Sequence, residues 1–356
     1  MAEKVHSDSA GCKSEDAFVA ARRHGEGARA ILEYLFPDLT LGNGSPDDPV
    51  VALSDEEEDA VANMVHFFLQ ARYEEASAEA IRCRRSRHPE IRELALLGHV
   101  MTNVAQHNTE AILNDFQTLN VKAQHPENRR VAVLNDVSRF VLSVFFHLSE
   151  DIAPLPQVDF RDSSEGIRLF SLYARSYAHY LQQEYAQALG VAEAALLMAA
   201  DRHQIISIYL NLAASMAAMN LSRFEQADQF FLHALELAIP DGYIQPFIGH
   251  HGPLQGMVEK HIRDREPELY KLIAEKVVRF RGGWTKIHNP QSPDKVTDLL
   301  TPYEYALAML AAKGRTNQEI ADFMYLSINT VKSYLSVIYQ KLGITKRTDL
   351  KACLSK

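Results

Sequence analysis

The residues best suited to chemistry lie near the carboxyl terminus, in a segment with helical periodicity. Asn329, Lys332, Ser333 and Ser336 recur at intervals of three, one and three and share one helix face. This face is short, polar and singly cationic, and it contains no acidic residue. Short polar side chains let a helix approach the floor of a DNA major groove, whereas carboxylates would be repelled by the phosphates. The alternative is an ordinary solvated face, which usually carries several Glu and Lys residues.

The opposite face of the same segment is apolar. Val331, Leu335, Ile338 and Leu342 recur at intervals of four, three and four. At about 100° per residue, the mean direction of these side chains lies about 140° from that of the polar set. The pattern therefore predicts a helix that buries one face in a small core and presents the other to nucleic acid.

Residues that begin or end helices divide the rest of this carboxyl-terminal segment into four short helices. Thr301, Asn317 and Ser327 are expected to cap the first three helices, and the fourth is expected to follow Arg347. Pro302 and Glu304, which come after Thr301, favour the start of the first helix. Helix ends are expected at Gly314 and Gly343, because glycine adopts the left-handed conformation that closes a helix.

This segment resembles the LuxR/GerE-type helix-turn-helix domain of bacterial transcription factors. The resemblance covers the whole segment, with Tyr334 where the family often has His and Tyr303 where it often has Arg. The matching positions are Leu300-Thr301-Pro302, Glu304, Leu307, Leu310, Gly314, Asn317, Glu319-Ile320-Ala321, Leu326-Ser327, Asn329-Thr330-Val331-Lys332, Leu335, Ile338-Tyr339, Lys341-Leu342-Gly343 and Arg347-Thr348.

The resemblance implies double-stranded promoter DNA as a partner and a homodimer on it, with the helix after Arg347 used for dimer contacts in many relatives. It also implies base reading by Lys332, Ser333 and Ser336, beside Asn329 on the same face. The phosphate contacts that it implies are Arg315, Thr316, Asn317, Thr330, Lys341, Lys346 and Arg347.

The charge of the chain is divided unevenly along its length. The 356 residues carry 37 Lys+Arg and 46 Asp+Glu, a net charge of −9. Residues 291–356 hold nine basic and six acidic side chains (+3), so the remainder holds 28 basic and 40 acidic ones (−12). This asymmetry is typical of a small nucleic-acid-binding module attached to a larger acidic one.

The larger module, residues 51–285, has helical periodicity throughout, after a poorly patterned segment 1–50 and before a polar linker 286–298. Three segments repeat one pattern: an aromatic residue, an Ala three positions later, and small or apolar residues four and seven positions after that Ala. The segments are RYEEASAEAIRC, EYAQALGVAEAAL and RFEQADQFFLHAL, and NTEAILNDFQTL is a degenerate copy. They resemble the second helices of tetratricopeptide repeats, and a generic bundle of helical hairpins is the alternative. The predicted fold is therefore all-α: a tetratricopeptide-like helical array followed by the four-helix domain.

The type of sensory region can be narrowed by what the sequence lacks. It offers no α/β receiver pattern, no tryptophan-rich acyl-homoserine-lactone sensor and no GxxxxGK[ST] phosphate loop. Residues 165–290, including YIQPFIGHHGPL (243–254), nevertheless resemble the helical-repeat region of the large ATP-driven MalT-type regulators. The chain thus resembles such a regulator without its ATPase.

An aromatic stripe within the helical region predicts a place where an effector could bind. If the repeat register holds, it forms one apolar groove, open to an aromatic small molecule or a partner helix, with plain core as the alternative. The groove residues are Phe170, Tyr173, Tyr177, Tyr180, Tyr209, Met216 and Met219.

Other functions are not indicated by the sequence. The three cysteines have no CxxC spacing, the histidines have no HExxH spacing, and no arrangement of catalytic residues stands out, so we expect no metal, no cofactor and no enzyme activity. The first residues have no apolar signal segment and no apolar run could span a bilayer, so a cytoplasmic protein is expected. The sequence therefore predicts a DNA-binding regulator controlled by an effector or partner, or alternatively a helical interaction scaffold anchored to DNA.

Overall fold

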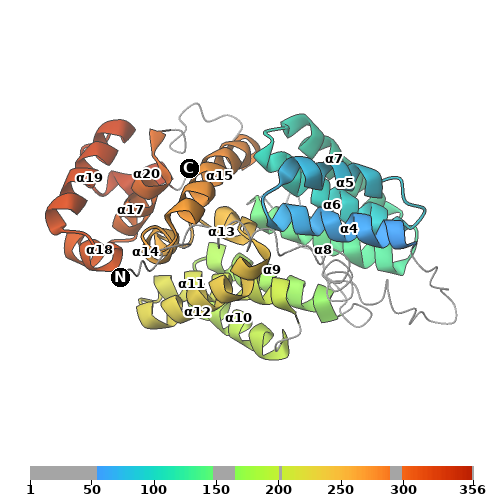
Figure 1. Cartoon of the computed structure of the whole chain (residues 1–356), viewed down its shortest axis with the longest axis horizontal. Coiled ribbons are helices and arrows are strands. Elements are labelled where there is room, and N and C mark those ends of the chain that lie inside the picture. The colour runs from blue at the N-terminus through green and yellow to red at the C-terminus, as the bar shows by residue number, and fades with distance from the viewer. Residues whose placement is uncertain (1–53, 147–164, 200–202, 289–298, 355–356) are drawn as a thin grey trace, which may run out of the picture.

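The computed structural model describes residues 54–146, 165–199, 203–288 and 299–354, and all regular elements in these ranges are helices (Figure 1). An amino-terminal helical group consists of α4 (Asp55–Leu69), α5 (Tyr73–Cys83), α6 (Pro89–Ala105), α7 (Thr109–Gln124) and α8 (Arg129–Phe145). A central helical group consists of α9 (Glu165–Leu181), α10 (Tyr185–Ala199), α11 (Gln204–Asn220) and α12 (Phe224–Ala238). The predicted all-α class is confirmed, while the expected segment 1–50 lies outside the described residues.

The helices pack as antiparallel pairs, and the repeated aromatic residues mark where the second helix of a pair begins. Tyr73, Tyr185 and Phe224 are the first residues of α5, α10 and α12. The small residues that follow them are fully or almost fully buried, which lets paired helices approach closely. The turn before each second helix, including α7, contains a residue with positive φ: Ala71, His107, Gln183 or Ser222.

Two pairs of the central group repeat the same internal hydrogen bond. The Ser176 hydroxyl of α9 donates to the Ala188 carbonyl of α10 at 2.7 Å. One period of 39 residues later, the Ser215 hydroxyl of α11 donates to the Ala227 carbonyl of α12 at 2.9 Å. Both serines are fully buried, so the bond satisfies a polar group where two helices meet.

The chain then forms short elements and one long helix: η3 (Ile239–Asp241), α13 (Gln245–Gly249), α14 (Met257–His261) and α15 (Pro267–His288). Helix α15 packs against α6 and also touches α17 of the carboxyl-terminal unit, and Figure 1 shows it between these two parts. Gly283 is where α15 meets α6, because a Cβ there would lie 1.7 Å from the Val104 carbonyl oxygen. Helix α15 extends three residues into the predicted linker, and the rest of that linker lies outside the described residues.

The carboxyl-terminal unit comprises α17 (Pro302–Ala312), α18 (Asn317–Met324), α19 (Ile328–Leu342) and α20 (Asp349–Leu354). Its core is built from buried side chains of all four helices, among them Leu307, Ile320, Val331, Ile338 and Leu350. In the described parts of the chain, no helix has the length and apolar character that crossing a membrane would require.

Candidate nucleic-acid interface

Side-chain caps fix the starts of the helices in the carboxyl-terminal unit. Before α17, the Thr301 hydroxyl accepts from the Glu304 N–H at 3.2 Å, and the Glu304 carboxylate accepts from the Thr301 N–H at 2.8 Å. Ser327 caps α19 by accepting from the Thr330 N–H at 3.0 Å. Gly314 and Gly343 have φ of 86° and 65° just beyond the ends of α17 and α19. These predicted boundaries are confirmed.

The second helix begins one residue earlier than the sequence indicated. Thr316, not Asn317, caps α18, with its hydroxyl accepting from the Glu319 N–H at 3.2 Å. Glu319 returns the bond by accepting from the Thr316 N–H at 2.6 Å, which completes a capping box. Asn317 lacks an acidic partner three residues later, so it becomes the first residue of the helix.

Helix α19 has the two faces that the spacing predicted. Val331, Leu335 and Ile338 are buried against α17 and α18, and Leu342, the fourth apolar position, is half-buried. The four candidate base-reading residues are all exposed: Asn329, Lys332, Ser333 and Ser336. Lys332 makes no ion pair with any described residue. The unit therefore presents an uncommitted polar helix face of the size that a major groove admits.

Several candidate phosphate contacts also hold the unit together. Arg347 donates to the Asn317 side-chain oxygen at 2.8 Å and to the Arg315 carbonyl, so it fastens the turn between α17 and α18. The hydroxyls of Thr330 and Ser327 lie 2.8 Å apart. Lys346 is exposed. Contact of these groups with phosphate remains a prediction.

Lys341 pairs with the carboxylate that caps α17. Its ammonium lies 2.7 Å from both Glu304 oxygens, and the Glu304 side chain is only 8% exposed. Burial opposes ionisation of Glu304, but the Lys341 ammonium and the Thr301 N–H outweigh it, so the pKa of Glu304 lies below its ordinary value. Lys341 thus joins the end of α19 to the start of α17.

We expect Lys341→Ala to lower the free energy of unfolding by about 1–2 kcal/mol at neutral pH, because a nearly buried carboxylate loses its cation. Since the pKa of Glu304 is lowered on folding, this contribution is complete above the ordinary value of 4.5 and is lost as the pH falls through the folded pKa. Urea titrations at neutral and acidic pH measure it. Lys332→Ala on the same helix is the matched control, and an equal loss in both variants would contradict the pairing.

Arg315, another candidate phosphate contact, makes its hydrogen bonds with the helical region. Its guanidinium donates to the Met219 carbonyl at 3.0 Å and to the Ser222 hydroxyl at 3.2 Å, at the end of α11. It also lies 4.5 Å from the centre of the Phe224 ring, the first residue of α12. In this arrangement the Arg315 guanidinium points toward the helical region.

The contact between the two parts is reciprocal, with cations of each lying over aromatic rings of the other. Arg281 and Arg263 of the helical region lie 3.5 and 4.7 Å from the ring centres of Tyr305 and Tyr303. Lys260 lies 4.7 Å from the centre of Phe323, which also packs beside Phe224.

A cation of the carboxyl-terminal unit likewise contacts a ring of the helical region. Lys313 lies 5.5 Å from the Tyr185 ring centre and 3.3 Å from its hydroxyl. Each such contact contributes about 0.5–1 kcal/mol at exposed sites.

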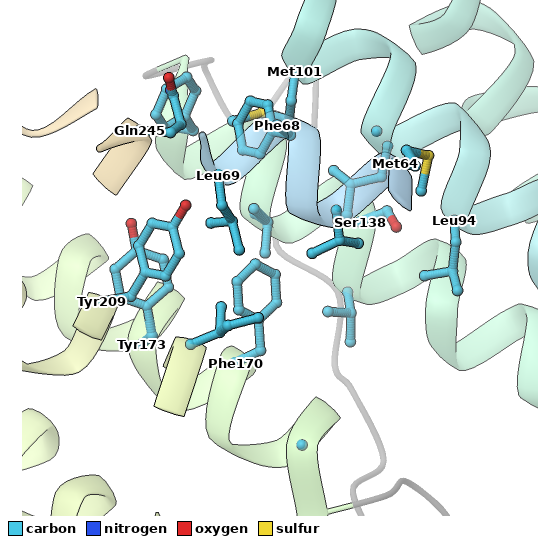
Figure 2. A pocket seen from close by; sticks show the side chains of 18 of the residues that line it. Met64, Phe68, Leu69, Leu94, Met101, Ser138, Phe170, Tyr173, Tyr209 and Gln245 are labelled. Atoms are coloured by element: carbon cyan, nitrogen blue, oxygen red, sulfur yellow. The ribbon is translucent and has the colours of Figure 1, made fainter. Parts of the chain in front are cut away.

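The residues of the predicted effector groove are divided between two cavities and the core. Phe170, Tyr173 and Tyr209 line an apolar cavity of about 170 Å³ (Figure 2). Tyr177 and Tyr180 line a second cavity of about 650 Å³ between the helical region and the carboxyl-terminal unit. Met216 and Met219 are fully buried. One continuous groove is therefore not formed.

The second cavity involves residues that the sequence did not indicate. Trp284 of α15 lines it, and its indole N–H donates to the Phe145 carbonyl at 2.8 Å. The Phe145 side chain lines both cavities. Lys351 and Leu354 of α20 also line the second cavity, so this helix faces the helical region. No local pattern could have indicated these residues, because they are far apart in the chain.

The carboxyl-terminal unit is defined by its fold as a helix-turn-helix DNA-binding domain, with α18 and α19 as the motif and α19 as the exposed helix. Residues 298–353 match the family described as "Bacterial regulatory proteins, luxR family", and this domain belongs to it. The predicted LuxR/GerE-type domain is confirmed. We refer to it below as the DNA-binding domain.

Similarity to named proteins extends over a larger part of the chain. The chain is 27% identical over 143 residues to the HTH-type transcriptional regulator MalT of Klebsiella pneumoniae subsp. pneumoniae and to that of Klebsiella pneumoniae strain 342. The match covers 36% of this chain but only 16% of each MalT protein. No solved structure matches the chain significantly. The distant resemblance to MalT-type regulators is therefore confirmed for part of the chain.

Proposed function

We propose that the protein is a transcriptional regulator that reads promoter DNA by placing α19 in the major groove. The observation that carries this proposal is the exposed face of Lys332, Ser333 and Ser336 opposite the buried face of the same helix. The family match of the domain supports it. Selection of bound duplexes from a random library with the purified chain tests it: an enriched motif is expected, and recovery of no motif would contradict sequence-specific reading.

We further propose that the helical region restrains the DNA-binding domain until an effector binds, and that the DNA-bound form is a homodimer. Arg315 is engaged by Met219, Ser222 and Phe224. Helix α20 lies against the cavity between the two parts, so its Lys351 and Leu354 side chains face the helical region. The −12 charge of the remainder of the chain would also repel phosphate when held near DNA.

The restraint predicts that Arg315→Ala has different effects in two contexts. In a fragment of residues 291–356, it should reduce the slope of log affinity against log salt by about one, because one phosphate contact is lost. In the effector-free full chain, the slope should not change, because Arg315 is held by the helical region. Affinity measurements over a range of salt concentrations compare the two.

Lys346→Ala is the matched control for this comparison. Lys346 is exposed, so its replacement should reduce the salt slope in both the fragment and the full chain. An equal reduction by Arg315→Ala in both contexts would show that Arg315 reaches phosphate without effector, and would remove the basis for the restraint. Circular dichroism of the fragment establishes that it is folded.

A further inference from the structure

The smaller cavity lies where the two helical groups meet. Helices α4, α6 and α8 of the amino-terminal group form one side, and α9, α11 and α13 form the other. Its volume of about 170 Å³ is close to the roughly 150 Å³ of an apolar cavity that accepts benzene. A partner helix, about 10 Å across, is too wide for it. The cavity is thus of a size for one small molecule a little larger than benzene.

The lining of this cavity is uncharged. Its wall is formed almost wholly by aliphatic, methionine and aromatic side chains, and none of the described residues that line it is Lys, Arg, Asp or Glu. His250 is the titratable exception besides the tyrosines, and burial lowers its pKa to about 4, so the imidazole is neutral near pH 7. An ionised ligand would enter without a counter-charge, which is costly in an apolar site. A molecule that binds in this cavity would therefore be neutral.

Most polar side chains of the cavity lie at one end, and Ser138 lies at the other. Figure 2 shows Tyr173, Tyr209 and Gln245 on one side of the pocket, and Met64, Leu94 and Ser138 on the opposite side. His250 Nδ1 donates to the Pro246 carbonyl at 2.7 Å, which leaves Nε2 to accept from the Tyr173 hydroxyl at 2.7 Å. The Tyr173 hydrogen is therefore committed to His250.

Two donors at this end remain without a partner among the described residues. The Gln245 oxygen accepts from the Tyr73 hydroxyl at 2.6 Å, but its amide N–H₂ group makes no hydrogen bond within the described ranges, although Gln245 is only 2% exposed. The Tyr209 hydroxyl likewise has no partner there, and burial raises its pKa, so it keeps its proton. Gln245 is buried and Tyr209 is partly buried, and polar groups at such places are normally paired, so an oxygen atom of a ligand would supply the partner that these two donors lack.

We infer that this cavity binds a small neutral molecule with an apolar ring and one hydroxyl or carbonyl oxygen, such as an alkylphenol. The oxygen lies at the end formed by Tyr209 and Gln245, and the ring and its alkyl group extend toward Met64 and Leu94. The inference names the class of effector for the regulator proposed above and to that extent rests on that proposal.

The position of the cavity connects it with the DNA-binding domain. His250 and Gly249 border the cavity, and the chain that follows them reaches the domain within a few residues. A Cβ on Gly252 would lie 3.1 Å from the Tyr305 ring of α17. Gly256, with φ of 89°, packs against Met324 of α18 in the same way, since a Cβ there would lie 2.9 Å from its sulfur. A ligand that shifts His250 is therefore adjacent to the contact that holds α17 and α18.

The test measures binding to the full-length chain in the absence of DNA, so that it is independent of promoter reading. Isothermal titration with 4-ethylphenol should show saturable binding of one molecule per chain, and ethylbenzene should bind more weakly. The anion 4-ethylbenzoate should not bind. Tyr209→Phe should weaken 4-ethylphenol about five- to tenfold by removing one hydrogen bond, and leave ethylbenzene within about twofold.

Two further variants complete the design. Tyr339→Phe makes the same chemical change on α19, outside the cavity, and should leave both affinities unchanged. Ser138→Leu adds bulk to the wall opposite Tyr209 and should weaken both compounds. Absence of saturable binding to the native chain, or equal affinity of the native and Tyr209→Phe proteins for 4-ethylphenol, would overturn the inference. Sequence-selective DNA binding that persists in that case would leave the proposed regulator intact.

Discussion

Lys332→Ala is expected to weaken binding to the cognate duplex by about 1–3 kcal/mol and to relax the base preference at one position of the site. Lys332 is exposed on α19, and no described residue neutralises its charge. The buried residue before it, Val331, fixes the direction in which the lysine points. Titrations against the cognate duplex and a set of single-base variants measure both effects, and Ser336→Ala should act in the same way at a neighbouring position.

The control for base reading is a lysine expected to contact only phosphate. Lys346→Ala should weaken binding to all duplexes alike and keep the order of preference. The unfolding midpoints of both variants should equal that of the native chain, because both side chains are exposed. If Lys332→Ala kept the full base preference, the groove-facing side of α19 would have to be assigned to other residues.

Gly283→Ala is expected to lower the free energy of unfolding of the whole chain by about 2–4 kcal/mol. The added Cβ would lie 1.7 Å from the Val104 carbonyl oxygen and 2.8 Å from its carbon. Because these are backbone atoms of α6, they cannot turn aside as a side chain could, so α15 must move away from α6. Denaturant titration measures the loss, provided that the slope of the transition is unchanged.

Gly190→Ala provides the opposite expectation at a matched glycine. Gly190 lies within α10, and apart from its own helix no atom of the described residues would come within 4 Å of its new Cβ. The substitution should stabilise the chain by about 0.5–1 kcal/mol, because alanine loses less conformational freedom than glycine on forming a helix. A Gly283→Ala protein as stable as the native chain would mean that α6 and α15 are not closely packed in solution.

The DNA-binding domain could be predicted in detail because its signals are local. Caps such as Thr301 and Ser327 act within three residues, and the spacing of Val331, Leu335 and Ile338 defines one helix face. The start of α18 was misplaced by one residue, since the Thr316–Glu319 pair outweighs Asn317 as a cap. The aromatic residues that begin α5, α10 and α12 could likewise be identified from the sequence, because the spacing to the small residues after them is local.

The candidate effector site was only partly predictable, because it depends on contacts between distant segments. The stripe from Phe170 to Tyr180 follows from helical spacing alone, but the spacing does not tell which side chains border empty space. Gln245 of α13 and His250, the residue after this helix, supply much of the polar end of the smaller cavity and lie far along the chain. The contacts of Arg315 with α11 and α12 could not be predicted from the sequence either, because an arginine near a helix start in this family is expected to contact phosphate.

Trp284 gives this protein an optical signal of its own. It is the single tryptophan of the chain, and its indole borders the cavity between the helical region and the DNA-binding domain. Its hydrogen bond reaches Phe145, whose ring also borders the smaller cavity. Fluorescence excited at the tryptophan band therefore comes from one position only, and its emission shifts to longer wavelength when water reaches the indole. Separation of the domain from α15 can thus be followed in the unlabelled chain, in real time and at low protein concentration.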